Sequence, residues 1–194
     1  MTGPNAAEAS FGAGLCRAMK KAGIRGRPAP VWMEGEALRI AGARAGGMIV
    51  PLERIERVRI GFYEGKYGKA YRSSVWVAGE PRPIEIQPMK PYRGYCAVMR
   101  RLAAEVARRR GIGAVERGIE RGLAVFNFAV LAGGFLALVL AFALGGDPSQ
   151  WPLLLLAIVF AGLALYAWRE MRRKHLPRPV TSLDALAVQL PEAE

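Results

Sequence analysis

Two long apolar segments dominate the hydropathy pattern of the chain. Residues 123–144 carry no charged side chain and one amide, Asn127, and residues 151–168 carry no charged side chain at all. As α-helices these segments would be about 33 and 27 Å long, which matches a hydrocarbon core of about 30 Å. Helices buried in a globular domain would need a polar stripe, and neither segment has one. The pattern therefore predicts a transmembrane helical hairpin over residues 123–168.

Short segments of alternating polar and apolar residues fill the region before the hairpin. Residues 34–36 (Glu-Gly-Glu) separate the first two of these segments and indicate a tight turn. Five or six short antiparallel strands at this spacing favour a small barrel or sandwich. The predicted strands cover residues 30–33, 37–40, 48–52, 55–63, 70–77 and 84–86.

The apolar spacing changes from that of a strand to that of a helix after Pro91. An apolar stripe with helical spacing predicts one amphipathic helix that covers an open end of the barrel. We expect this domain to span residues 28–110 and a short helix at 111–122 to lead into the hairpin. The stripe consists of Tyr95, Val98, Met99, Leu102 and Val106.

The two ends of the chain leave alternatives open. Residues 1–27 are predicted to form either a flexible arm or a short basic amphipathic helix. Residues 169–194 begin with a basic stretch and continue as a tail in which Ser182 can cap a short turn. That turn would dock on the barrel, dock on a partner or stay loosely ordered.

The formal charge of +12 does not indicate nucleic-acid binding, because much of it flanks the predicted hairpin. Basic residues next to membrane helices are explained by topology and by anionic lipid headgroups. The turn at 145–150 has no Lys or Arg, so we expect both termini in the cytoplasm. The residues expected to contact headgroups are Lys66, Lys69, Arg117, Arg121, Arg169, Arg172, Arg173 and Lys174.

The residues needed for catalysis or metal binding are scarce. The only cysteines are Cys16 and Cys96, which we expect to be reduced, and the only histidine is His175. These residues do not make a convincing zinc site. No phosphate-binding loop or nucleophile elbow is present. We therefore expect no enzyme, metal or cofactor; an enzymatic alternative would require Arg59, Tyr71, Arg72 and Trp76 to converge on a concave pocket.

The order of predicted elements resembles the pleckstrin-homology (PH-like) domain of bacterial membrane proteins. The resemblance covers roughly residues 28–110 and is carried by Val31-Trp32, by residues 48–63 (MIVPLERIERVRIGFY) and by residues 92–106 (YRGYCAVMRRLAAEV). It implies an α+β fold, a small antiparallel barrel closed by a C-terminal helix. With the two-helix hairpin, this predicts a multi-pass protein of the bacterial cytoplasmic (inner) membrane.

Small residues recur at helical spacing along both apolar segments, which allows helix backbones to approach closely. They are Ala129, Gly133, Ala137 and Ala141 in the first segment, and Ala157 and Ala161 in the second. Two interpretations stay open: contact only within the hairpin, or contact with a further partner. The expected partners are membrane lipids and either a membrane protein or a second copy, with no nucleic acid. The expected function is a non-enzymatic adapter, accessory subunit or assembly factor; the alternative is a small accessory subunit of a transport system.

Overall fold

The computed structural model describes residues 9–65, 68–90, 92–119, 121–145, 151–174 and 176–191. These residues divide into two compact units, described separately. The first unit contains the sheet and comprises the chain up to Ile119 together with the segment from Pro177 onward. The second is helical and runs from Glu120 to Leu176.

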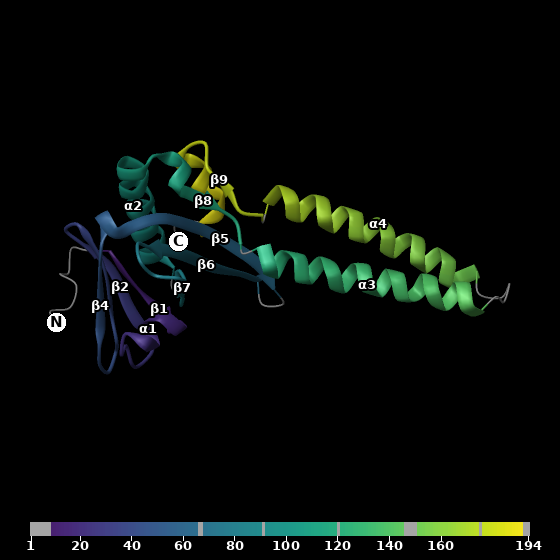
Figure 1. Cartoon of the computed structure of the whole chain (residues 1–194), viewed down its shortest axis with the longest axis horizontal. Helices are drawn as coiled ribbons and strands as arrows, with labels where there is room; N and C mark the ends of the chain where they lie inside the picture. Colours follow the sequence, from purple (N-terminus) through teal and green to yellow (C-terminus); the bar gives the residue numbers. More distant parts are fainter. Residues whose placement is uncertain are drawn as a thin grey trace. The chain divides into compact units, whose positions relative to one another are not determined.

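The described strands of the first unit form one nine-stranded sheet in the order β4-β3-β2-β1-β7-β6-β5-β8-β9 (Figure 1). Neighbouring strands pair antiparallel, except that β8 lies parallel to β5. The sheet is therefore mixed. The strands are β1 Ser10–Gly14, β2 Ala29–Glu34, β3 Ala37–Ala41, β4 Gly47–Pro51, β5 Ile55–Gly65, β6 Gly68–Val77, β7 Ile84–Pro88, β8 Val115–Arg117 and β9 Arg178–Pro179.

The predicted fold class, a small antiparallel PH-like barrel, is wrong. Strands β2 to β7 lie at the six segments that the alternation predicted, but they belong to the larger mixed sheet. The sheet is mixed because β8 pairs parallel with β5 at the β8–β9 edge. The prediction had placed a helix over 111–122, but Val115–Arg117 forms this strand instead. Three residues are too few to show a strand period, so their pairing partner determines their conformation.

The hairpin between β2 and β3 has the tight turn expected from its sequence. Glu34 pairs with Ala37, which leaves Gly35 and Glu36 as a two-residue connection. Gly35 has a φ of 55°, a conformation that residues with a Cβ rarely adopt. Glycine at the first position of a two-residue hairpin turn is the preferred choice for this reason.

Helix α2 (Arg93–Arg110) covers the apolar face of the sheet. All five residues of its predicted stripe are at most 1% exposed, and they join one core with the inward side chains of the strands. The start of α2 lies directly on β1, because a Cβ on Gly94 would be 1.8 Å from the carbonyl oxygen of Ser10. Glycine at position 94 therefore permits the close approach of helix and strand.

Residues near the N-terminus belong to the sheet. β1 lies between β2 and β7, and it buries Phe11 and Ala13 in the core. A short helix, α1 (Arg17–Lys21), follows and buries Met19. Residues 10–21 are therefore not a flexible arm. The burial of Phe11, Ala13 and Met19 fixes this segment on the sheet.

The C-terminal tail also packs on the sheet unit. After β9 the chain forms a short 3₁₀ segment, η4 (Leu183–Gln189), and buries Val180, Leu186 and Leu190 in the same core as α2. The Cys96 thiol of α2 donates a hydrogen bond to the Pro191 carbonyl oxygen at 3.1 Å. Of the alternatives left open for the tail, the structure shows docking on the sheet domain. The other short 3₁₀ segments are η1 (Leu52–Arg54) and η2 (Ile112–Ala114).

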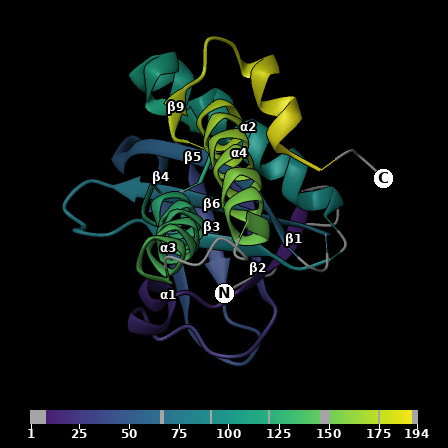
Figure 2. The same cartoon turned by 90° about the vertical axis from the view of Figure 1, so that its right-hand side faces the viewer.

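The helical unit consists of α3 (Arg121–Gly145) and α4 (Trp151–Lys174), which run side by side (Figure 2). Among the described residues, no helix combines the length and the apolarity needed to cross a membrane. This finding overturns the predicted transmembrane hairpin, the assignment to membrane proteins and the multi-pass inner-membrane localisation.

Candidate interaction surfaces

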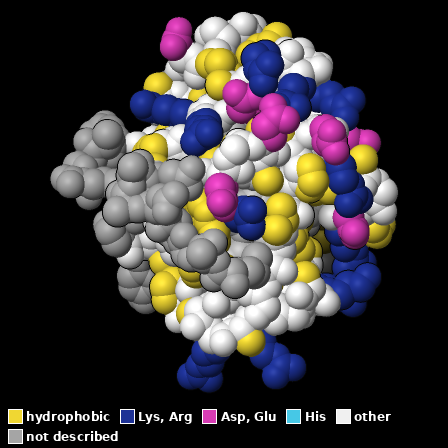
Figure 3. Space-filling view, turned by 90° about the vertical axis from the view of Figure 1, so that its left-hand side faces the viewer, with side chains coloured by type: hydrophobic (Ala, Val, Ile, Leu, Met, Phe, Trp, Pro, Cys, Tyr) yellow, Lys and Arg dark blue, Asp and Glu magenta, His cyan; other side chains and the backbone are white. Residues whose placement is uncertain are grey.

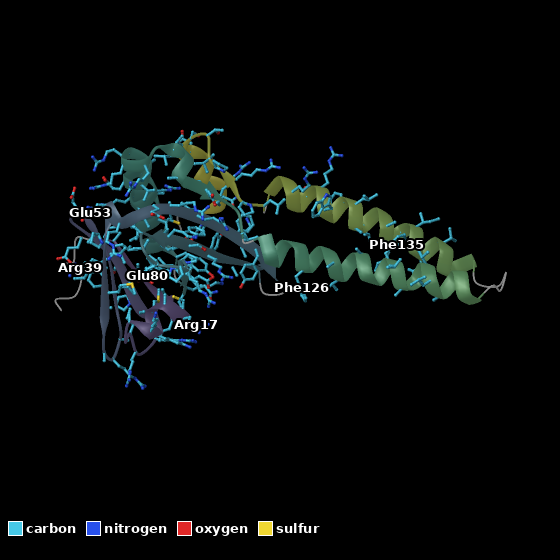
Figure 4. All side chains as sticks on the ribbon, viewed as in Figure 1. Arg17, Arg39, Glu53, Glu80, Phe126 and Phe135 are labelled. Carbon is cyan, nitrogen blue, oxygen red and sulfur yellow. The ribbon has the colours of Figure 1, made fainter. Side chains whose placement is uncertain are left out.

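Helices α3 and α4 contact each other through one face of each helix. On α3 the partly buried residues are Ala132, Phe135 and Val139, which recur at helical spacing. On α4 the contact face includes Ala164, which is only 8% exposed, and the partly buried Ala161. Figure 4 shows Phe135 on the side of α3 toward α4 and Phe126 on the side away from it.

The predicted row of small residues on α3 lies on the opposite face. Ala129, Gly133, Ala137 and Ala141 are all exposed. A Cβ on Gly133 would meet no atom within 4 Å, so this glycine is not needed for contact with α4. At 100° per residue, the row is centred about 150° from the buried face of α3. On α4 the described member, Ala161, is on the contact face, and the side chain of Ala157 lies outside the described residues.

Large apolar side chains accompany the small row on the exposed side of α3. Phe126 is 64% exposed and Leu136 is 56% exposed, with Val130 and Leu140 similar. We call these four residues together with the small row the α3 outer face. Helix α4 also exposes large apolar residues, up to 70% at Leu165. Contiguous exposed apolar surface of this kind marks an association site.

A cluster of polar and aromatic side chains lies on the outer face of the sheet, across β5, β6 and β8. The guanidinium carbons of Arg57 and Arg59 lie 4.0 and 4.8 Å from the ring centroid of Trp76. Glu116 accepts a 3.0 Å hydrogen bond from Arg57 and a 2.8 Å hydrogen bond from Arg59. We call these four residues the Arg–Trp cluster.

The alternation of β5 and β6 places the Arg–Trp cluster on one face. Arg57 pairs with Trp76 across the two strands, and Arg59 pairs with Glu116 of β8. The side chains of Arg59 and Glu116 are only 13% and 12% exposed, so both charges are largely removed from water. Their ion pair gives each of these charges a partner of opposite sign. The cluster therefore holds β8 on β5 and leaves little free hydrogen-bonding capacity on Glu116.

Other arginines of the sheet unit are also compensated within the unit. Arg72 forms an ion pair with Glu85 of the neighbouring strand, and Arg39 forms one with Glu34. Arg109 of α2 pairs with Glu36 at 2.7 Å. Figure 3 shows acidic side chains lying among Lys and Arg side chains on one face of the molecule. Such pairs set the orientation of side chains and contribute little stability where they are exposed.

Tyr71 does not lie on the same face of the sheet as Arg59, Arg72 and Trp76. Tyr71 lies against the core, with its ring 6.0 Å from that of Phe62 and 6.2 Å from that of Tyr95. Since successive side chains of a strand point to opposite faces, Arg72 and Trp76 lie on the other side of β6. These four side chains therefore lie on two faces of the sheet.

A buried polar pair lies inside the core of the sheet unit. The hydroxyl oxygens of Ser73 and Tyr95 are 2.7 Å apart, and both residues are fully buried. Burial raises the pKa of Tyr95 far above its usual value, although the Ser73 hydrogen bond acts in the opposite direction. Burial also raises the pKa of the Cys96 thiol, against the opposing charge of Arg100. Both groups are thereby kept neutral, which suits a structural role.

The predicted headgroup contacts are distributed over both units. Lys69 on β6 is exposed, and its ammonium nitrogen lies 5.0 Å from the ring centroid of Phe62. Arg117 lies on β8, and Arg169 and Arg172 are exposed near the end of α4. Lys66 and the side chains of Arg121, Arg173 and Lys174 lie outside the described residues.

No group of His, Cys, Asp and Glu side chains able to hold a metal ion occurs in the described part of the chain. Comparison with protein-family models, with curated proteins and with solved structures gives no match to this chain.

Sequence reasoning missed Glu116 as the partner of Arg57 and Arg59. Only the alternation of β5 and β6, which put these arginines and Trp76 on one face, pointed toward the cluster.

Proposed function

We propose that the chain is a non-enzymatic adapter that binds another protein through the α3 outer face and presents its sheet domain beside that partner. The observation that carries this proposal is the exposure of Phe126, Val130, Leu136 and Leu140 on the face of α3 that does not contact α4. Covering one such side chain contributes about 1.5–3 kcal/mol. Several together give enough free energy for stable association.

The chemistry of the α3 outer face specifies the kind of partner. It contains no charged residue, so a partner gains nothing from ion pairs and must itself be apolar. The exposed row Ala129, Gly133, Ala137 and Ala141 allows another backbone to approach closely. Both properties favour an apolar helix of a second protein as the occupant.

The test compares the parent protein with Gly133→Leu. A leucine at this position enters open space in the isolated chain, so the α3–α4 contact is preserved while close approach of a partner helix is blocked. We expect the full-length protein, tagged and isolated from its natural cells in mild detergent, to retain a partner that Gly133→Leu loses. Native gels combined with identification of the retained proteins provide the measurement.

Gly162→Leu is the matched control, because a Cβ at Gly162 of α4 also meets no atom within 4 Å. Both substitutions improve helix propensity by a similar amount. Equal migration of Gly133→Leu and the parent would contradict the proposal. A complex that contains only copies of this chain would replace the adapter with self-association, whereas a retained polytopic permease would specify an accessory subunit of a transport system.

A further inference from the structure

Strands β8 and β9 place two arginines directly opposite each other. Arg117 pairs with Arg178 in the antiparallel register of the two strands, so their side chains lie on the same face. Arg117 is partly buried and Arg178 is exposed. Within the described residues, neither guanidinium has an ion-pair partner. This differs from Arg57, Arg59 and Arg72, each of which has a carboxylate on a neighbouring strand.

The register keeps the two arginines together. The Val180 amide donates a 2.9 Å hydrogen bond to the Val115 carbonyl oxygen, and both valines are buried in the core. A slip of β9 by one residue would bring Val180 out of the core. Like charges placed directly opposite each other destabilise a strand pair. The fold therefore keeps two positive charges next to each other, and a bound anion would reduce the repulsion between them.

Among the described residues, no acidic side chain pairs with Arg117 or Arg178. Glu116 is engaged by Arg57 and Arg59, and it points to the other face of β8. The eight residues that end at Arg178, MRRKHLPR, contain four Lys or Arg and no Asp or Glu. The first acidic residue after Arg178 is Asp184. Within the part of the chain that the structure describes, both guanidiniums are therefore open to an anion from outside the chain.

We propose that Arg117 and Arg178 form a binding site for a phosphate-bearing anion. Each guanidinium presents parallel N–H donors that match two phosphate oxygens. A phosphate group offers enough acceptor oxygens and negative charge for two guanidiniums at once. A lipid headgroup and free phosphate share this chemistry.

The experiment uses the full-length protein in a neutral detergent and two probes. One probe is inorganic phosphate, and the other is phosphatidylglycerol mixed into the micelles. Binding is followed by ³¹P NMR and by the thermal unfolding midpoint of the sheet unit. We expect Arg117→Gln/Arg178→Gln to weaken binding by about tenfold or more, because two charge-assisted contacts are lost. Arg100→Gln/Arg101→Gln, which removes two exposed charges from α2, should bind as the parent does.

Each arm of the experiment gives a decisive outcome. A response to inorganic phosphate assigns a soluble ligand, and a response to phosphatidylglycerol alone assigns a lipid headgroup. Without an anion, the Arg117→Gln/Arg178→Gln protein should unfold at the same or a higher temperature, because repulsion is removed. A lower midpoint, an equal loss in the Arg100→Gln/Arg101→Gln control, or no response of the parent to either probe would overturn the proposal.

Discussion

Tyr95 illustrates how one residue connects the chemistry of the core to its stability. Its ring packs edge-on against Phe11 with a centroid distance of 5.2 Å, and its hydroxyl meets Ser73 at 2.7 Å. Helical spacing predicted the ring as part of the apolar stripe of α2. The hydroxyl partner was not predictable, because Ser73 comes from a strand whose inward face is otherwise apolar.

Tyr95→Phe should lower the free energy of unfolding by about 1–3 kcal/mol, because Ser73 is left buried and unpaired. Adding Ser73→Ala should recover much of that loss, and urea unfolding of both variants checks this.

The raised pKa of Tyr95 adds a pH dependence to the stability of the fold. Above the unfolded pKa of about 10, only the unfolded chain releases this proton, so stability falls as the pH rises. Tyr95→Phe should flatten this alkaline decline; an unchanged slope would show that other groups cause it.

At the scale of elements, the strands with a clear period were predictable and the shortest ones were not. β2 to β7 and α2 each contain enough residues to show an alternation or a helical stripe. The register shift between Ile55 and Arg57 explains why the alternation in β5 is loose at its start. β8 and β9 have only three and two residues, so their structure depends on hydrogen bonds to strands that are distant in sequence.

The tail after β9 behaves as an element of the core. Leu186 and Leu190 are 1% and 4% exposed, whereas Leu183 in the same segment is 39% exposed. Leu186→Ala and Leu190→Ala should each lower the free energy of unfolding by about 2–5 kcal/mol. Leu183→Ala is the matched control and should change it by less than about 1 kcal/mol. Thermal or urea unfolding measures the difference; three equal values would mean that the tail is not part of the folded core.

At the scale of the whole molecule, the sheet unit is discontinuous in sequence. Its two parts meet where Glu116 of β8 pairs with Pro179 of β9, and the helical unit is inserted between them. The insertion therefore leaves and re-enters the sheet unit through two neighbouring strands. This arrangement makes each unit a separate structural body connected by two short segments.

Replacing residues 120–176 with a flexible linker of about eight residues should leave the sheet unit folded. Paired strands are about 4.8 Å apart, so a linker of this length easily joins residues 119 and 177. A cooperative unfolding transition and dispersed amide NMR signals would check this expectation. A chain that aggregates or lacks a cooperative transition would show that the sheet unit requires the helices.

The sequence alone determined the local elements of this protein, because apolar period and turn residues act over a few neighbouring positions. It placed β2 to β7, the tight turn at Gly35, helix α2 and two helices near the C-terminus. Tertiary structure decided the sheet class, the core role of β1 and of the tail, and the face on which the α3 small row lies. These features depend on pairing between distant segments, which no local pattern records. Apolarity by itself predicted a transmembrane hairpin, and the described helices do not support that prediction.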